Sequence, residues 1–423
     1  MASVRGQVAV TPPGDDARPA DVEVGDEALS IAFEGGETVT LPFVDIDDLH
    51  DDDYTLRLTD FTGRRLDLSM LGSAYGQILE DVRERRNEAL QRDLLLTGVN
   101  LQDTFPGKVF GGADPMPAEL RLFEDQLVVM PERGRMWGLP FSFVDAVDWD
   151  QELYQVRVRA DDGTTNVFGH LAKRSEEFRD ELNRLLAALA KRTAATLLSL
   201  LPGADPGALD RLAAVMRDGR AVQQRVVEAI DPALWPKLED AVVGTADLRQ
   251  TYEWLKARGP SGWPALGVKA VRGKADEGPA APAEAEATEA APTEAAPTAS
   301  VLWFFVPFEG RNAVAQEITS EAGHATYLFR PVEPEAFAGL SGDAMAEAVA
   351  VGVARLNRAL LTLNFRREPI YASDEEIATG RFSRYRVALR VLDHLRFARR
   401  QFLGRAIHNE TWERQVEEAV ARA

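Results

Sequence analysis

The chain has 423 residues, which is enough for about two to four domains of roughly 150 residues each. Its 68 acidic and 48 basic residues give a net charge of −20, which disfavours binding of the whole molecule to nucleic acid or anionic lipid and favours a basic partner. The chain has no cysteine, which excludes disulfides, thiolate catalysis and cysteine-ligated zinc. Because its five histidines are scattered, we expect neither a metal site nor a cofactor.

The sequence predicts a cytoplasmic protein. Its longest apolar runs fall far short of the ~20 residues that span a bilayer. The stretch "MASVRGQVAVTPPGDD" lacks the apolar core of a signal peptide.

The first 98 residues are predicted to form strands and then a helix. Apolar and polar residues alternate in three stretches, the pattern of strands with one buried face: Leu29/Ile31/Phe33, Val39/Leu41/Phe43 and Tyr54/Leu56/Leu58. The turn residues "GDE", "EGGE" and "DFTG" separate these stretches. The spacing of Tyr75, Ile78, Leu79 and Val82 then predicts an amphipathic helix.

An internal repeat organises the first 190 residues. "LPF" at Leu41 matches "LPF" at Leu139, and after two extra residues Tyr54 meets Tyr154 and Gly63 meets Gly163. A helix with Phe178, Leu182, Leu185 and Leu189 on one face ends the second copy. A period near 100 residues indicates a domain duplication, with domains at 1–98 and 99–190.

Each copy resembles the pleckstrin-homology-like (PH-like) superfold, including its bacterial and GRAM-type relatives. The resemblance rests on the predicted strands, the "LPF..VD" strand entry and the terminal helix. It implies two tandem antiparallel β-barrels, each closed by a C-terminal helix. Phosphoinositide-binding members carry a basic cluster in the first hairpin loops, whereas these loops read "GDE" and "EGGE". We therefore expect a protein partner rather than a membrane.

The acidic stretch "LPFVDIDDLHDDDYTLRLTDFTG" is interpreted as a solvated hairpin. Asp45 and Asp47 alternate with apolar residues and are expected to face solvent along a strand, and "HDDDY" is expected to form the following turn. The stretch lacks the central glycine of a calcium-binding loop. The candidate partner-binding residues here are Asp45, Asp47, Asp51, Asp52 and Asp53.

Residues 191–272 are predicted to be a helical extension that packs on the second barrel. Two cap signatures, Asp205-Pro206 and Asp231-Pro232, predict helix starts. Residues 273–299 contain 11 Ala, 5 Glu and 4 Pro and no large apolar residue, which predicts a disordered linker.

Residues 300–423 are predicted to form a C-terminal α+β domain, so the whole chain belongs to the α+β class. Strand-like stretches begin at Ser300, Asn312 and Ala325, and a helix carries the stripe from Met345 to Leu360. A second long helix from about Ser383 is expected to bury Val387, Val391, Leu395 and Phe402. Its opposite face would carry the candidate binding residues Arg386, Arg390, Arg396 and Arg400.

Charge is distributed unevenly along the chain. Residues 1–98 carry 9 bases and 21 acids, or −12, whereas 366–405 carry ten Arg and five acids, or +5. The arginine face is therefore expected to be solvated, to form an intramolecular contact with the acidic barrels, or to bind an acidic partner or nucleic acid.

The first functional hypothesis is a non-catalytic scaffold whose tandem PH-like domains bind a basic protein partner. The alternatives are an enzyme with an active site in 300–423, and nucleic-acid binding through the arginine-rich helix. For the enzyme, His324, His394 and His408 are candidates to meet Glu317 or Asp374 in space.

Overall fold

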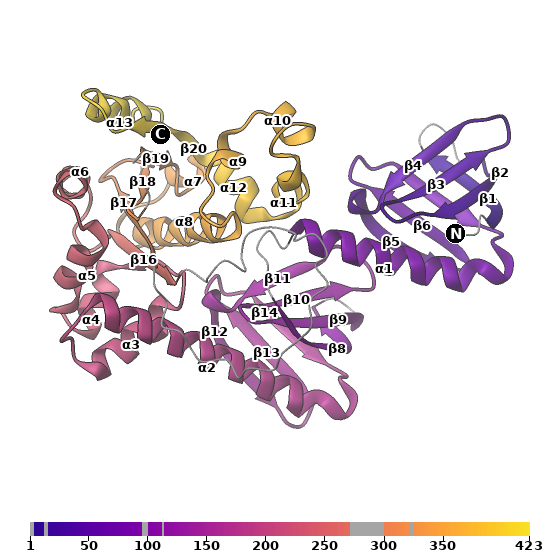
Figure 1. The fold of residues 1–423 in the computed structure, drawn as a ribbon, viewed down its shortest axis with the longest axis horizontal. Helices are drawn as coiled ribbons and strands as arrows, with labels where there is room; N and C mark the ends of the chain where they lie inside the picture. Colours follow the sequence, from indigo (N-terminus) through magenta and orange to yellow (C-terminus); the bar gives the residue numbers. More distant parts are fainter. Residues whose placement is uncertain (1–3, 12–15, 95–99, 112–113, 271–299, 321–324) are drawn as a thin grey trace, which may run out of the picture.

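The computed structural model shows a mixed α+β protein with three antiparallel sheets, and it describes residues 4–11, 16–94, 100–111, 114–270, 300–320 and 325–423 (Figure 1). Two of the sheets have seven strands and the third has six. The linker predicted at 273–299 and the candidate His324 lie outside the described residues.

The first sheet has the strand order β4-β3-β2-β1-β7-β6-β5. Its strands alternate between buried and exposed residues, as the sequence pattern predicts. No pairing joins β4 to β5 among the residues that the structure describes, so the sheet is open along these two edges. The strands are β1 Val4–Thr11, β2 Arg18–Val24, β3 Ala28–Phe33, β4 Thr38–Pro42, β5 Ile46–Asp52, β6 Thr55–Asp60 and β7 Arg65–Ser69.

The second sheet repeats this order as β11-β10-β9-β8-β14-β13-β12, so the internal repeat is present in the fold. Equivalent turn residues share a left-handed backbone, with φ of 57° at Tyr54 and 50° at Tyr154, and 86° at Gly63 and 81° at Gly163. The strands are β8 Leu101–Phe110, β9 Met116–Phe123, β10 Gln126–Pro131, β11 Trp137–Pro140, β12 Val144–Asp150, β13 Gln155–Ala160 and β14 Thr165–Gly169.

A helix follows each sheet and extends beyond it. Helix α1 (Tyr75–Leu94) packs Ile78 and Val82 into the core of the first repeat, and α2 (Ser175–Leu200) does the same with Phe178 and Leu182 in the second. The last turns of α1 place Leu90 and Leu94 in a core shared with the second repeat and the C-terminal part. Strand β10 is therefore buried on both faces.

The predicted helical extension is not a separate unit. It contains helices α3 (Pro206–Met216), α4 (Gln224–Ile230), α5 (Leu234–Val243) and α6 (Ala246–Lys256), and Asp205 caps α3 as predicted, by accepting a hydrogen bond from the Ala208 N–H. It also contributes strands β15 (Val222–Gln223) and β16 (Ala265–Ala270) to the third sheet. Strand β16 pairs along its whole length with β17, across the predicted linker.

The third sheet runs β15-β16-β17-β18-β19-β20, and its remaining strands are β17 Ser300–Pro307, β18 Val314–Ile318, β19 Ala325–Phe329 and β20 Phe402–Ile407. Helices α7 (Pro334–Phe337), α8 (Gly342–Thr362), α9 (Glu368–Tyr371) and α10 (Asp374–Ala378) follow β19, and α13 (Trp412–Val420) ends the chain. One face of the sheet packs against the core that contains α8, and the other against α5, α6 and α13.

The prediction of one continuous helix from about Ser383 is wrong. The chain forms α11 (Arg386–Val391) and α12 (Asp393–Gln401), separated by Leu392, whose φ of −82° and ψ of 117° are extended. From Phe402 it continues as strand β20 rather than as helix. Of the residues that the sequence pattern assigned to one stripe, Val387 and Leu395 are buried on the two short helices, whereas Val391 and Phe402 are half-buried.

Candidate functional site

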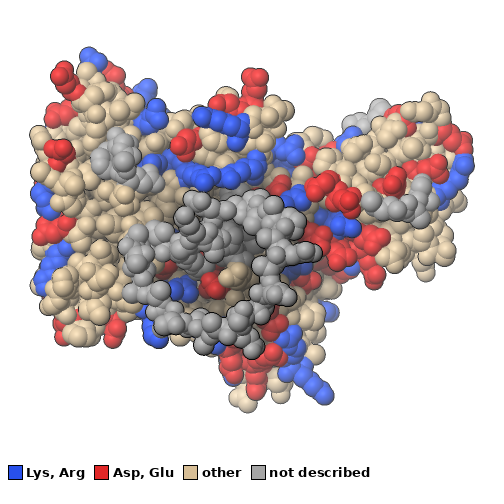
Figure 2. Space-filling model, in the orientation of Figure 1, with Lys and Arg blue, Asp and Glu red and all other residues tan. Residues whose placement is uncertain are grey.

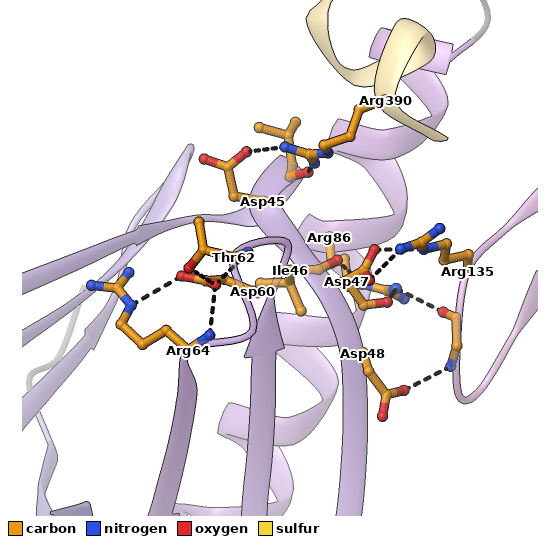
Figure 3. A network of polar contacts seen from close by, with 12 residues as sticks. Asp45, Ile46, Asp47, Asp48, Asp60, Thr62, Arg64, Arg86, Arg135 and Arg390 are labelled. Atoms are coloured by element: carbon orange, nitrogen blue, oxygen red, sulfur yellow. Dashed lines mark hydrogen bonds and ion pairs between the residues drawn. The ribbon is translucent and has the colours of Figure 1, made fainter. Parts of the chain in front are cut away.

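The acidic stretch of the first repeat lies where three parts of the chain meet (Figure 3). Strand β4 ends in a short 3-10 turn, η1 (Phe43–Asp45), which places Phe43 fully inside the sheet core. The pairing of β5 with β6 then shifts register between Ile46 and Asp48. This bulge aims neighbouring acidic side chains in different directions.

Asp45 is buried rather than solvent-facing, which corrects the expectation from alternation. It is only 8% exposed. Its Oδ1 accepts hydrogen bonds from Arg390 at 2.9 Å and Arg386 at 3.3 Å, both on α11. Arg390 also donates to the Val44 carbonyl at 2.7 Å and lies 4.1 Å above the ring of Phe61. The first repeat and the arginine-rich region are therefore in direct contact.

Asp47 and Asp48 contact the second repeat. The Arg135 Nε donates to Asp47 at 2.6 Å, and the Gly134 N–H donates to Asp48 at 3.0 Å. Both donors lie in the loop between β10 and β11. Asp47 is thus half-buried at an interface, which differs from the solvent-facing position expected for it.

Arg86 on α1 completes this junction. Its guanidinium donates to the carbonyls of Ile46 at 3.1 Å and Asp47 at 3.0 Å, and to that of Gly134 at 2.7 Å. Burial lowers the pKa of Arg86 to about 10, and Asp48 and Asp47 oppose that shift, so the side chain stays charged at neutral pH. One buried cation therefore connects both repeats.

Sequence reasoning missed Arg86, although a signal existed. Ile78, Val82, Arg86 and Leu90 follow one another at helical spacing, so the arginine interrupts an otherwise apolar stripe. An arginine at such a position must find acceptors within the fold, because an unpaired buried charge is costly.

The other three candidate acids lie toward the hairpin tip. Asp51 accepts a hydrogen bond from the Tyr75 hydroxyl. Burial raises the pKa of that hydroxyl, and the bond to Asp51 adds to the shift. Asp52 and Asp53 are exposed, and Asp52 lies 3.9 Å from Arg57. Beside them Tyr54 is 76% exposed, so the tip presents acids and an aromatic ring to solvent.

The four candidate arginines do not form one face. Arg386 and Arg390 contact Asp45, whereas Arg396 pairs with Asp393 on its own helix. Arg400 pairs with Glu333 at 3.1 Å. The break at Leu392 separates the two pairs.

The second repeat uses its equivalent corner in a similar way. Arg220 donates to Asp145, the counterpart of Asp45, at 3.0 Å. Arg358 on α8 contacts Asp161 at 2.5 Å and lies 4.6 Å above the ring of Phe143. Burial raises the pKa of Asp161 despite both arginines. The C-terminal part therefore holds each repeat by an arginine–aspartate contact.

A groove lies between the edge strand β12 and helix α2. It has a volume of about 270 Å³, and its lining residues include Val144, Val147, Leu186, Ala187 and Ala190. The equivalent place in the first repeat contains Arg86 and the β10–β11 loop. The same corner is thus filled in one repeat and hollow in the other.

The C-terminal part contains one of the expected histidine–carboxylate pairs. The Nε2 of His408 lies 3.1 Å from Oε1 of the fully buried Glu317. Thr326, which sequence reasoning did not single out, donates to Glu317 at 2.8 Å. His394 instead lies 2.9 Å from the Thr362 hydroxyl, and burial lowers its pKa to about 3.

In the described part of the chain, no group of three or more His, Asp or Glu side chains is placed to hold a metal ion. Over the same residues, no helix combines the length and apolar character needed to cross a membrane.

Comparisons with known proteins do not assign a family. No protein-family model and no curated protein matches the chain. Among solved structures it is similar to "the C-terminal domain of an unknown protein from Leishmania infantum", with 12% identity and a TM-score of 0.19, over 21% of this chain and 86% of that one.

Proposed function

We propose that the chain is a non-catalytic interaction scaffold in which two PH-like domains bind a basic protein partner. The repeated seven-strand order with a helix after the last strand supports the PH-like relationship. We further propose that each sheet bends into the barrel of that superfold around the apolar face of its helix. A cytoplasmic location fits this role.

The observation that carries the proposal is the acidic corner of the first repeat. Within the chain it already binds cationic side chains from two other regions. Asp45 accepts a hydrogen bond from Arg390, and Asp47 accepts one from Arg135. Charge-assisted hydrogen bonds of this kind are directional and strong. The same chemistry suits a basic partner at the exposed acids Asp52 and Asp53, beside the ring of Tyr54.

The surface distribution of charge agrees with this assignment. In Figure 2, acidic side chains gather near the junction of the first repeat with α1 and at the lower end of the second repeat. Basic side chains form a row across the C-terminal part. The acidic ends of the repeats would repel anionic lipid, so we propose a protein partner rather than a membrane.

The test measures binding of a fluorescent Arg/Lys-rich peptide to the full chain by anisotropy. We expect the double change Asp52→Asn and Asp53→Asn to weaken binding about 5- to 20-fold, and added salt to weaken it further. The matched control is Asp16→Asn with Asp21→Asn, which removes the same charge at two exposed positions away from the tip. If both double variants weaken binding equally, the peptide recognises only the net charge of the protein and not the hairpin tip. Tight binding of the protein to phosphoinositide vesicles would contradict the proposal.

A second candidate function, catalysis, has one supporting observation. Glu317, Thr326 and His408 form a connected polar group around a buried carboxylate. A carboxylate that orients a histidine is a recurring arrangement for general acid–base work. We place it second because neither Glu317 nor His408 lines the groove between β12 and α2. Replacing His408 with Ala should leave binding of the basic peptide unchanged if the scaffold function is correct.

A further inference from the structure

A second hollow lies between the second repeat and the C-terminal part. This cleft has a volume of about 380 Å³, at the small end of the roughly 300–1,000 Å³ typical of small-molecule sites. Phe143 and Asp161 of the repeat line one side, and α3, β15 and α8 line the others. Such junctions between folded units are frequent ligand sites.

Most of the cleft wall is apolar. Val222, Val226, Ala350 and Val353 all line it. Val226 is 37% exposed, so part of its apolar side chain is accessible to solvent. The wall therefore offers apolar surface that a ligand would remove from water.

One guanidinium in the cleft lacks an acidic partner. Arg217 donates to the carbonyls of Ala214 at 3.1 Å and Phe141 at 3.3 Å, and the described part of the chain gives it no carboxylate within ion-pair distance. Burial and the nearby Arg220 lower the pKa of Arg217, and the more weakly acting Asp145 and Asp161 oppose that shift. A guanidinium has more N–H donors than these two contacts use.

The backbone at Arg217 is also strained. Its φ of 27° and ψ of 139° lie outside the regions that non-glycine residues prefer. Strain of this kind persists where the surrounding structure fixes a side chain in place, and it is frequent at ligand sites. Arg217 lines both the cleft and the neighbouring groove, so this residue borders both hollows.

The other charged residues of the cleft limit the negative charge that a ligand can carry. Asp145 and Asp161 also line the cleft, and Arg220 and Arg358 pair with them. These acids would repel a multiply charged anion such as a phosphate monoester. A ligand with one negative charge avoids most of that repulsion and supplies the carboxylate partner that Arg217 lacks.

We propose that this cleft binds a small monocarboxylate with an apolar body. Its carboxylate would accept hydrogen bonds from Arg217, and its apolar part would lie against Val222, Val226 and Val353. A planar carboxylate matches the fork of guanidinium N–H groups. The proposal does not depend on the basic partner assigned above.

The test uses octanoate as the probe and isothermal titration with the full chain. Octanoate is expected to bind with one saturable site, whereas octylammonium, which has the same chain and the opposite charge, is expected not to bind. Arg217→Gln should weaken octanoate binding at least tenfold, and Arg217→Lys should weaken it less. The matched control is Arg211→Gln, at an exposed position on α3, the helix that ends just before Arg217.

A filling variant tests the apolar wall independently. Ala350→Trp places an indole in the cleft, so octanoate binding should disappear while Arg217 is intact. The near-ultraviolet circular dichroism of Arg217→Gln shows whether this variant folds like the natural chain. If it does not, Ala350→Trp still tests the proposed site. Absence of saturable octanoate binding, equal binding by Arg217→Gln, or full binding by a folded Ala350→Trp would each overturn the proposal. Equal affinity for octanamide would overturn the carboxylate requirement.

Discussion

Individual charged residues connect the three parts of this molecule. Arg86 has three carbonyl acceptors from two repeats, and Asp45 has two arginine donors from the C-terminal part. Buried ions of this kind are stable only while all their partners are present. Removal of one member therefore leaves the others buried without compensation, whereas an exposed pair loses little.

Arg86→Met should lower the free energy of unfolding by about 2–4 kcal/mol, because the carbonyls of Ile46, Asp47 and Gly134 lose a charged donor. The measurement is urea denaturation followed by tryptophan fluorescence. Arg85→Met serves as the control, since Arg85 is exposed and should change stability by about 0.5 kcal/mol or less. Equal losses from both variants would show that the Arg86 contacts are not specific.

The lowered pKa of Asp60 predicts that the stability of the fold depends on pH. Burial raises its pKa, but hydrogen bonds from Thr62 and Arg64 outweigh burial and hold the pKa below its ordinary value of 3.8. The unfolded chain therefore binds this proton more readily. The stabilisation is fully present above pH 3.8 and is lost as the pH falls through the lower pKa of the folded state.

Asp60→Asn should make the unfolding free energy fall less steeply below pH 4 than in the natural chain. Denaturation at a series of pH values gives that slope, and Asp21→Asn, at an exposed position, is the comparison. A slope unchanged by Asp60→Asn would contradict the assigned role of this hairpin carboxylate.

At the scale of elements, the two repeats share packing details as well as strand order. An added Cβ at Gly6 would lie 2.6 Å from Leu71, and one at Gly107 would lie 2.5 Å from Leu171. In each repeat this leucine lies just before the 3-10 turn that leads into the helix. The first strand passes so close to it that a Cβ on that strand would force the leucine side chain to shift. A 3-10 turn likewise begins at the Phe of "LPF" in both copies.

Gly107→Ala should therefore destabilise the second repeat by about 1–3 kcal/mol through overpacking. A double-mutant cycle with Leu171→Val tests whether contact with Leu171 is the cause. The double variant should then lose less unfolding free energy than the sum of the losses of the two single variants. Gly111→Ala is the control, since nothing lies within 4 Å of its added Cβ. Strict additivity of Gly107→Ala and Leu171→Val would rule out the proposed contact.

At the scale of the whole molecule, the third sheet joins segments on both sides of residues 271–299. Strand β16 pairs with β17 from Ala265↔Phe305 to Ala270↔Ser300. Their side chains also enter shared cores, since Leu266 and Phe304 belong to one core and Ala265, Trp303 and Phe305 to another. The chain before this segment and the chain after it therefore form one folded unit.

A site-specific protease site placed within 273–299 should give two fragments that stay together on size-exclusion chromatography, because their association is maintained by the sheet and its cores. Denaturant should be needed to separate them. Gly267→Val should lower the denaturant concentration that separates the fragments, because an added Cβ would lie 2.0 Å from the Trp303 ring. Fragments of the natural chain that elute separately without denaturant would contradict the shared sheet.

The sequence by itself determined the features that repeat locally. Alternation gave strands such as Ala28–Phe33, helical spacing gave α1 and α2, and the matched "LPF" corners predicted the duplication, because each pattern reflects burial on one face of one element. Only the tertiary structure decided what the charged residues do. Asp45 and Arg390 are hundreds of positions apart, and no local periodicity encodes their contact. The same holds for β16 and β20, whose partners in the third sheet come from distant segments, so their pairing depends on how whole units pack.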